Sequence, residues 1–214
     1  MSKIFSIGHF SHESLSNFEA NSPAGDQVQH EILKQFENFV GSDNTICYSM
    51  QTIPAWPNGP ILVGSNRNKN IIFPSFFNLP VLKHIQFSIS VFFALFRIKP
   101  NICVSYNSYL FENITMLMFR KLRPETALVS ILQDVNCTKK ISFKDFHKIK
   151  KILEITGIEL AKKFNLLIPI SDAIASDFNF DKDKFFVFRG GLSKFSKNMM
   201  SISCLLYTSD AADE

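Results

Sequence analysis

The stretch FNLLIPISDAIASDFNFDKDKFFVFRGG, residues 164–191, decides the fold that we expect for this chain. Residues 166–168 form an apolar run whose length is typical of a strand buried on both faces. Ser171 and Asp172 follow, and their side-chain oxygens can accept hydrogen bonds from the free N–H groups in the first turn of a short helix. This pattern predicts a strand that leads directly into a capped helix ending near Phe178.

A second apolar segment, residues 185–188, follows a polar turn and predicts another strand. It ends at Arg189, Gly190 and Gly191, where the paired glycines permit positive φ angles and a close approach of the backbone to a ligand. The whole stretch therefore predicts one β-α-β unit with a loop at the carboxyl end of each strand. Open α/β sheets bind their ligands at that edge.

Strand-like and helix-like segments alternate along the remainder of the chain. Short apolar runs predict strands at residues 3–7, 45–50, 102–105 and 127–132. Periodic apolar positions predict helices at residues 24–40, 110–122 and 139–163, the last being one helix or two that meet at Gly157. Residues 61–63 and 71–73 indicate a hairpin or an extra edge strand. The alternation predicts an α/β fold of Rossmann-like type, with a mainly parallel sheet and helices on both faces.

Four of these runs are predominantly apolar, and we expect them to be neighbouring parallel strands with buried side chains. They are residues 4–7, 102–104, 129–132 and 166–168. Apolar residues also gather on one side of two predicted helices. In the first helix they are Val28, Ile32, Leu33, Phe36, Phe39 and Val40, and in the helix at 110–122 they are Leu110, Ile114, Leu117 and Met118.

The most hydrophobic stretch is residues 79–98. Its uncharged core, residues 85–96, is well short of the roughly 20 apolar residues that a helix needs to cross a bilayer. Lys83, His84 and Arg97 bound this core. The stretch predicts a buried crossover helix that leads into the strand at 102–105.

Length, charge and cysteine spacing limit the possible classes. At 214 residues, with 23 Lys and Arg against 19 Asp and Glu, the chain is basic and long enough for one sizeable α/β domain. Residues 204–214, CLLYTSDAADE, resemble a translated sequencing adapter, and we expect them to be a non-native tail. Cys47, Cys103 and Cys137 lack CxxC spacing, which favours small buried side chains in a reducing compartment over a disulfide or a metal site. Residues 1–10 do not fit a signal peptide, so we expect a cytoplasmic protein.

Several strand-end positions resemble one enzyme family. Ser171 stands after a strand like the serine of a motif xxSxxxxxxL, and Gly190-Gly191 ends the next strand where Asn-Gly is usual. Residues 97–107, RIKPNICVSYN, are similar to a KPDVVHxH segment, and Gly25 stands where a glycine-rich loop meets the first helix. Together these positions resemble the N-terminal, acceptor-side domain of GT-B glycosyltransferases, in particular glycosyltransferase family 4.

The resemblance implies one half of a GT-B fold over residues 1–192, with residues 193–203 opening a linker to a donor-binding domain that this sequence lacks. It implies transfer of a sugar from a nucleotide-sugar to an acceptor hydroxyl with retention of configuration, in cell-envelope polysaccharide or glycolipid synthesis. Neither a metal ion nor a cofactor is implied. Because the family holds the donor mostly in its second domain, we expect this chain alone to be inactive.

The resemblance also assigns candidate site residues. Asp134 follows the strand at 127–132 and is the expected catalytic residue, because a carboxylate at a strand end can orient an acceptor hydroxyl. The alternative is that Asp134 caps the following segment. The expected substrate-binding residues are Gly25, Asp26, Asn107, Ser108, Ser171, Arg189 and Gly190. His9, His12 and His30 could approach the first loop, although His12 fits a solvated position and His30 an ordinary helix face.

The expected partners are a nucleotide-sugar and a carbohydrate or lipid-linked acceptor. The lysine-rich segment at 139–163 could contact anionic lipid at the inner face of the membrane, or it could be a solvated helix face. Nucleic acid is not expected, because the aromatic residues do not interleave with the basic ones. Neither GxSxG nor GxxxxGK[ST] occurs, which counts against hydrolase and P-loop functions. The alternative function is a non-catalytic Rossmann-like or flavodoxin-like module that binds a nucleotide or a partner.

Overall fold

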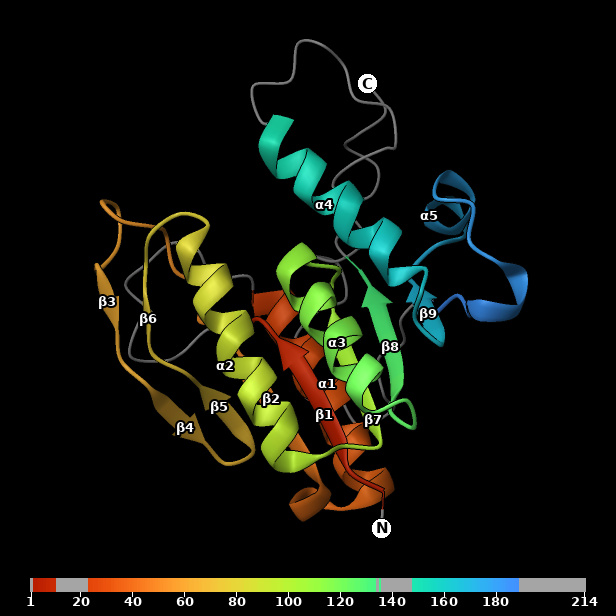
Figure 1. The fold of residues 1–214 in the computed structure, drawn as a ribbon, viewed down its shortest axis with the longest axis horizontal. Helices are drawn as coiled ribbons and strands as arrows, with labels where there is room; N and C mark the ends of the chain where they lie inside the picture. Colours follow the sequence, from red (N-terminus) through yellow and green to blue (C-terminus); the bar gives the residue numbers. More distant parts are fainter. Residues whose placement is uncertain (1, 11–22, 134, 136–147, 189–214) are drawn as a thin grey trace, which may run out of the picture.

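A computed structural model describes residues 2–10, 23–133, 135 and 148–188 of the chain (Figure 1). Seven strands form one sheet in the order β4-β5-β2-β1-β7-β8-β9. The parallel strands are β1 (Ile4–Gly8), β2 (Thr45–Ser49), β5 (Ile71–Phe73), β7 (Ile102–Tyr106), β8 (Ala127–Leu132) and β9 (Leu166–Pro169). At one edge, β4 (Asn66–Asn68) pairs antiparallel with β5 as a hairpin. A separate antiparallel pair joins β3 (Leu62–Val63) to β6 (Phe76–Phe77).

This order confirms the predicted Rossmann-like α/β fold. The four runs expected to be neighbours are the consecutive strands β1, β7, β8 and β9, and their side chains are mostly buried. The chain moves outward from β1 through β2 to β5, returns to the centre at β7, and then moves outward in the other direction. The order reverses between β1 and β7, so that pair is the topological switch point of the sheet.

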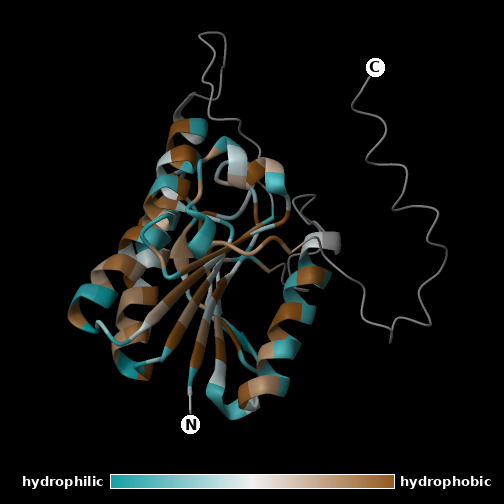
Figure 2. Cartoon of the chain, turned by 90° about the vertical axis from the view of Figure 1, so that its right-hand side faces the viewer, coloured by the Kyte–Doolittle hydropathy of each residue, from teal (hydrophilic) through white to brown (hydrophobic). Residues whose placement is uncertain are grey.

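Helices cover both faces of the sheet, as predicted (Figure 1). One face carries α1 (Pro23–Val40), and the other carries α2 (Leu82–Ile98), α3 (Leu110–Leu122) and α4 (Lys148–Ala161). The short α5 (Asp172–Asp177) follows β9. Short 3-10 turns at Ser42–Asn44 and Lys182–Lys184 complete the described elements. Hydrophobic and hydrophilic segments alternate along the helices on both sides of the sheet (Figure 2).

The core lies in two layers because successive strand residues point to opposite faces. Phe5, Ile7 and Cys103 belong to the larger cluster, which packs against α2, α3 and α4. Ile4 and Val104 belong to the cluster that packs against α1. Cys47 and Cys103 are free and buried, as their sequence contexts indicate.

Three predicted helix faces need correction. Phe39, expected on the apolar face of α1, is 83% exposed. In α3 the apolar side faces solvent at Ile114 and Met118, while the buried side contains Glu112 and Asn113. The polar residues point inward because Glu112 meets His9 and Asn113 meets the neighbouring helix. Helix α2 is the predicted crossover, but only one of its sides is buried.

The remaining segments agree in part with their predictions. Gly157 lies inside a single helix, which rejects two helices meeting there, although residues 139–147 of the predicted helix lie outside the described residues. The predicted strand at 185–188 runs beside β9 through one parallel bridge, Leu167 to Phe185, and through backbone bonds from Phe186 and Phe188. None of the described helices is both long enough and apolar enough to cross a membrane.

Candidate active site

The switch point brings the ends of β1 and β7 together. Past the carboxyl end of β1 the chain reaches His9, and past that of β7 it reaches Asn107 and then α3. Because the connections that follow these two strands lie on opposite faces of the sheet, a crevice for ligands is expected between them.

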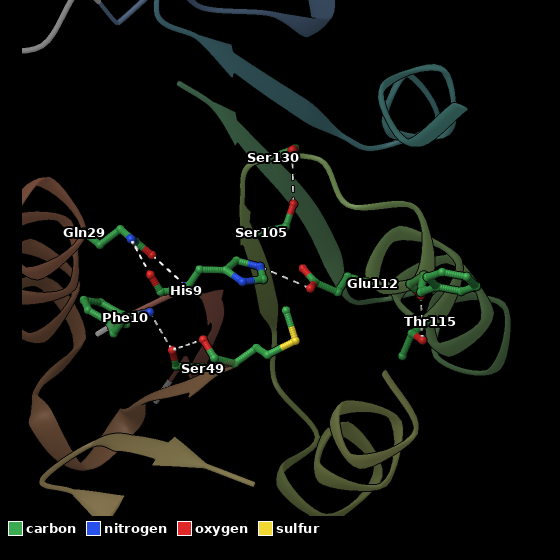
Figure 3. A network of polar contacts seen from close by, with 10 residues as sticks. His9, Phe10, Gln29, Ser49, Ser105, Glu112, Thr115 and Ser130 are labelled. Atoms are coloured by element: carbon green, nitrogen blue, oxygen red, sulfur yellow. Dashed lines mark hydrogen bonds and ion pairs between the residues drawn. The ribbon is translucent and has the colours of Figure 1, made fainter. Parts of the chain in front are cut away.

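A buried imidazole and a buried carboxylate meet there. The Nε2 atom of His9 lies 3.2 Å from Oε1 of Glu112, and the two side chains are 7% and 1% exposed (Figure 3). The distance is that of an ion pair, but the atoms are not aligned as a hydrogen bond, and among the described residues neither carboxylate oxygen has a hydrogen-bond partner. A buried carboxylate without hydrogen bonds is costly, by roughly 1–3 kcal/mol or more for a charged group. A hydrogen-bond donor brought to Glu112 by a bound ligand would therefore be stabilising.

The backbone of His9 is fixed by helix α1. Its N–H donates to Oε1 of Gln29 over 2.9 Å, and Nε2 of Gln29 donates back to the His9 carbonyl over 3.1 Å (Figure 3). The next residue, Phe10, donates its N–H to Oγ of Ser49 at the end of β2 over 2.7 Å. A Cβ at Gly8 would lie within 3.0 Å of both Phe10 and Gln29, so glycine is needed for this close packing. The backbone around His9 is thus held by α1 and by the end of β2.

Aromatic and basic groups surround the pair. The ring of Tyr109 lies 4.1 Å from that of His9, and the ring of His84 lies 6.1 Å from that of Tyr109. Burial lowers the pKa of His84 to about 4; the charge of Glu112 opposes this shift, and His9 and Lys83 add to it. Burial also lowers the pKa of Lys83, whose Nζ donates to the carbonyl of Ile53 over 3.2 Å. At neutral pH, His84 is therefore a neutral hydrogen-bonding group.

This arrangement supports proton transfer. A neutral imidazole that presents one N–H to a carboxylate keeps a lone pair on its other nitrogen, where it can accept a proton. The carboxylate stabilises the imidazolium that forms. The alternative is a purely structural ion pair, since buried His–carboxylate contacts also occur without catalysis.

Two of the predicted site residues lie on the helix that fixes the His9 backbone. Gly25 and Asp26 are in the first turns of α1. The carbonyl of Gly25 accepts a hydrogen bond from Nε2 of Gln29 over 3.5 Å, which links it to the His9 backbone. Gly25 thus takes part in fixing His9.

Asn107 and Ser108 lie at the same edge and hold the scaffold together. Asn107 has a left-handed φ of 61°, and its Oδ1 accepts from the N–H of Gln133 over 3.1 Å, which joins the ends of β7 and β8. Oγ of Ser108 accepts from Nδ2 of Asn113 over 2.6 Å, and the same amide donates to the carbonyl of Gly157 over 2.9 Å. These contacts join β7, α3 and α4 below the candidate site.

Ser171 is the N-cap of α5. Its Oγ accepts from the N–H of Ile174 over 3.4 Å, which is the capping role that its position in the sequence also indicated. The predicted residues Asp134, Arg189 and Gly190 lie outside the described residues.

Sequence reasoning named His9 but missed Glu112. The available signal was an acid inside the otherwise uncharged and mostly apolar run LFENITMLMF, shortly after a predicted strand. Such an acid is seldom buried without a partner. The partner could not be identified from the sequence, because residues 9 and 112 are far apart along the chain. Within the described ranges, no three His, Cys, Asp or Glu side chains gather as a metal site would require.

Comparisons with known proteins support the fold and leave the family open. No protein-family model matches the chain, and no curated protein matches its sequence. UDP-GlcNAc 2-epimerase from Methanocaldococcus jannaschii matches 87% of this chain with a TM-score of 0.51 and 8% identity, over 45% of its own length. A putative UDP-N-acetylglucosamine 2-epimerase from Listeria monocytogenes matches 86% of the chain with a TM-score of 0.46 and 7% identity, over 44% of its length.

A trehalose 6-phosphate synthase from Burkholderia multivorans matches 84% of the chain with a TM-score of 0.40 and 9% identity, over 42% of its length. The chain therefore spans less than half the length of each of these three structures. At 8% identity, the likeness to the Methanocaldococcus jannaschii epimerase shows a shared fold. It is the Rossmann-like architecture of one half of a GT-B protein.

Proposed function

We propose that this chain is the acceptor-side half of a GT-B sugar transferase and that His9 and Glu112 form its proton-transfer pair. One observation carries the proposal: a buried imidazole and a buried, hydrogen-bond-deficient carboxylate lie 3.2 Å apart at the switch point of the sheet. That is where doubly wound sheets bind their ligands. A buried polar group without a hydrogen-bond partner calls for an explanation, and a catalytic role is one such explanation.

In the proposed reaction an acceptor hydroxyl approaches His9. The hydroxyl proton passes to the imidazole as the acceptor oxygen bonds to the anomeric carbon of a nucleotide-sugar. The bond from that carbon to the phosphate oxygen breaks, and the nucleoside diphosphate leaves with the electron pair. Glu112 stabilises the imidazolium until the proton is released.

The donor and the remaining residues keep their proposed roles. The nucleotide-sugar would be held mostly by a second domain, joined through the segment after residue 192. Asp134 directly follows Gln133, whose backbone is tied to Asn107 at the same edge, and we retain it as a candidate acceptor ligand. Arg189 and Gly190 are retained as candidate contacts at the hinge. A carbohydrate or lipid-linked alcohol is the proposed acceptor class, in the cytoplasm.

The test is a transfer assay with the complete protein encoded at the locus. His9→Ala and Glu112→Gln should each lower kcat/KM by about 10²- to 10⁴-fold, the range typical of a lost general base. The control is Glu125→Gln, which removes an exposed carboxylate from an ion pair with Arg123 and should leave kcat/KM unchanged. If both His9→Ala and Glu112→Gln retained full kcat/KM, the pair would have no catalytic role.

The anomeric configuration of the product is a second readout. A direct displacement assisted by His9 inverts the anomeric carbon, whereas the resemblance to glycosyltransferase family 4 implies retention. An inverted product from the wild-type enzyme would favour His9 as the base. A retained product would limit His9 and Glu112 to binding and orienting the acceptor.

A second candidate function is a binding module without catalysis. It is favoured by the observation that Ser108 and Ser171 are engaged in hydrogen bonds within the scaffold. This function predicts that a nucleotide binds to the chain without turnover and that His9→Ala changes its stability but no reaction rate.

A further inference from the structure

Helix α2 presents a stripe of large apolar side chains to solvent. The exposed residues recur at spacings of three and four, which places them on one side of the helix; they are Leu82, Ile85, Ile89, Phe93 and Phe96. The opposite side, with Phe87, Val91 and Leu95, is fully buried against the sheet. Helix α2 therefore has apolar side chains on two opposite sides although only one of these sides is covered, and its packing in the fold leaves Phe93 68% exposed.

A second stripe lies on the neighbouring helix. Ile114, Met118 and Leu122 repeat every four residues along α3, and all three are exposed. Helices α2 and α3 pack side by side on the same face of the sheet, with the rings of Phe96 and Phe119 5.6 Å apart (Figure 1). The two stripes form one surface, which we call the α2–α3 face. It continues into a groove of about 620 Å³ between α3 and α4.

The exposed charges within helices α2 and α3 are of one sign. Helix α2 contains no acidic residue, and the only acid of α3, Glu112, is buried. The C-terminal ends of the two helices carry Arg97 and Lys121, both exposed. The groove beside α3 is lined by Arg120, Lys121 and Lys163 and by no acidic side chain. The face therefore combines apolar bulk with positive charge at one end.

We propose that the α2–α3 face docks the protein onto an anionic lipid surface. Contiguous exposed apolar patches of this kind are uncommon on proteins that stay in solution as monomers. An apolar helix side flanked by Lys and Arg is the pattern by which helices lie in a membrane interface, with attraction to anionic head groups adding to the burial of apolar side chains.

A second copy of the chain fits the face less well. A two-fold contact places this surface against itself, so the residues of one copy meet the same residues of the other. Such a contact offers no exposed carboxylate from α2 or α3 to either cationic end. An anionic lipid surface supplies the missing negative charge.

The proposal is tested by co-sedimentation of the chain with vesicles. Vesicles of phosphatidylcholine mixed with phosphatidylglycerol should bind the protein, and phosphatidylcholine alone should bind it more weakly. The double variant Ile89→Ser with Phe93→Ser should weaken binding by about tenfold or more, since it removes two side chains that enter the interface. Both positions are exposed, so circular dichroism should show an unchanged fold. Raising the salt concentration should also weaken binding, because salt screens the attraction between the basic residues and the anionic head groups. The Debye length is about 10 Å at 0.1 M salt and becomes shorter above it.

The matched control is Phe39→Ser, which removes an exposed aromatic residue from α1 on the other face of the sheet. Binding should be unchanged in this variant. Equal loss of binding in Phe39→Ser and in the double variant would overturn the proposal, as would equal binding to neutral and anionic vesicles. If the wild-type chain did not bind vesicles but formed a dimer, and if the double variant were monomeric, the occupant of the α2–α3 face would be a second copy of the chain. Hydrogen exchange of the wild-type chain gives an independent reading, in which vesicles should protect α2 and α3.

Discussion

At the scale of single residues, Gly157 illustrates how strongly packing can override local preference. A Cβ at this position would approach the backbone carbonyl oxygen of Ser108 more closely than real Cβ atoms do, and it would lie 3.1 Å from the N–H nitrogen of Leu110. Both contacts are with backbone, so no side-chain rotation can relieve them. Glycine thus lets α4 approach the segment that precedes α3.

We expect Gly157→Ala to destabilise the fold by about 2–3 kcal/mol, the usual range for overpacking. In an uncrowded helix the same change would stabilise by about 1 kcal/mol, because alanine is the better helix former. The measurement is urea unfolding. Gly64→Ala is the control, since a Cβ there meets no atom within 4 Å. A stable Gly157→Ala protein would show that α3 and α4 can separate without loss.

His84 gives a pH-dependent prediction at the same scale. Its pKa falls from the ordinary value of 6.5 to about 4 because burial disfavours the charged ring. The folded state therefore favours neutral His84, and the resulting stability is fully present above pH 6.5 and is lost as the pH falls from 6.5 towards 4. In this window His84 should contribute a loss of up to about 1.4 kcal/mol per pH unit.

The check is a series of urea unfolding curves between pH 7 and pH 5. His84→Gln should flatten the dependence relative to the wild type, whatever the remaining groups contribute. Identical slopes for the wild type and His84→Gln would mean that the pKa of His84 is the same in the folded and unfolded states, against the expected lowering.

At the scale of elements, α3 shows where reading a sequence by hydrophobic periodicity fails. The apolar positions Ile114 and Met118 suggested the core side, yet the side that packs inward carries Glu112 and Asn113. The apolar residues do lie on one side of α3, but that side faces solvent and not the core. The partners of these two side chains, His9 for Glu112 and Gly157 for Asn113, come from distant segments that no local pattern reveals.

In α3, replacing a buried polar residue should cost more stability than truncating an exposed apolar one. Asn113 donates to Ser108 and to the carbonyl of Gly157, so Asn113→Ala should leave both without their partner and cost about 1–3 kcal/mol. Met118→Ala, which truncates an exposed apolar residue on the same helix, should cost less than about 0.5 kcal/mol. Thermal unfolding of the two variants decides the point. If Met118→Ala were the more damaging change, the inward face of α3 would be assigned wrongly.

At the scale of the whole molecule, the sheet was predictable and the site only partly so. Apolar runs such as residues 102–104 are enough to predict buried parallel strands, because a strand covered by helices on both faces consists almost entirely of apolar residues. Residues 61–63 and 71–73 were expected to form a hairpin or an extra edge strand, but β3 pairs with β6 and β5 pairs with β4, because strands this short carry no periodic signal that reveals their partners. His9 was a candidate because it follows a strand end, whereas its contact with Glu112 depends on the order of strands in the sheet.

The last prediction concerns the whole chain as one wall of a cleft. Transfer between two substrates gains most of its rate from holding both in one geometry, and this gain requires groups on both sides of the reacting atoms. We therefore expect the 214-residue chain to show no sugar transfer, and a longer protein that continues the native reading frame past Ser203 to bind a nucleotide-sugar and turn it over. Calorimetry with nucleotide-sugars and a transfer assay on both proteins are the measurements. If the continuation encoded no second Rossmann-like domain, the two-domain proposal would be wrong and the noncatalytic binding module would account for the result. If the short chain alone transferred sugar, the two-domain proposal would also be wrong.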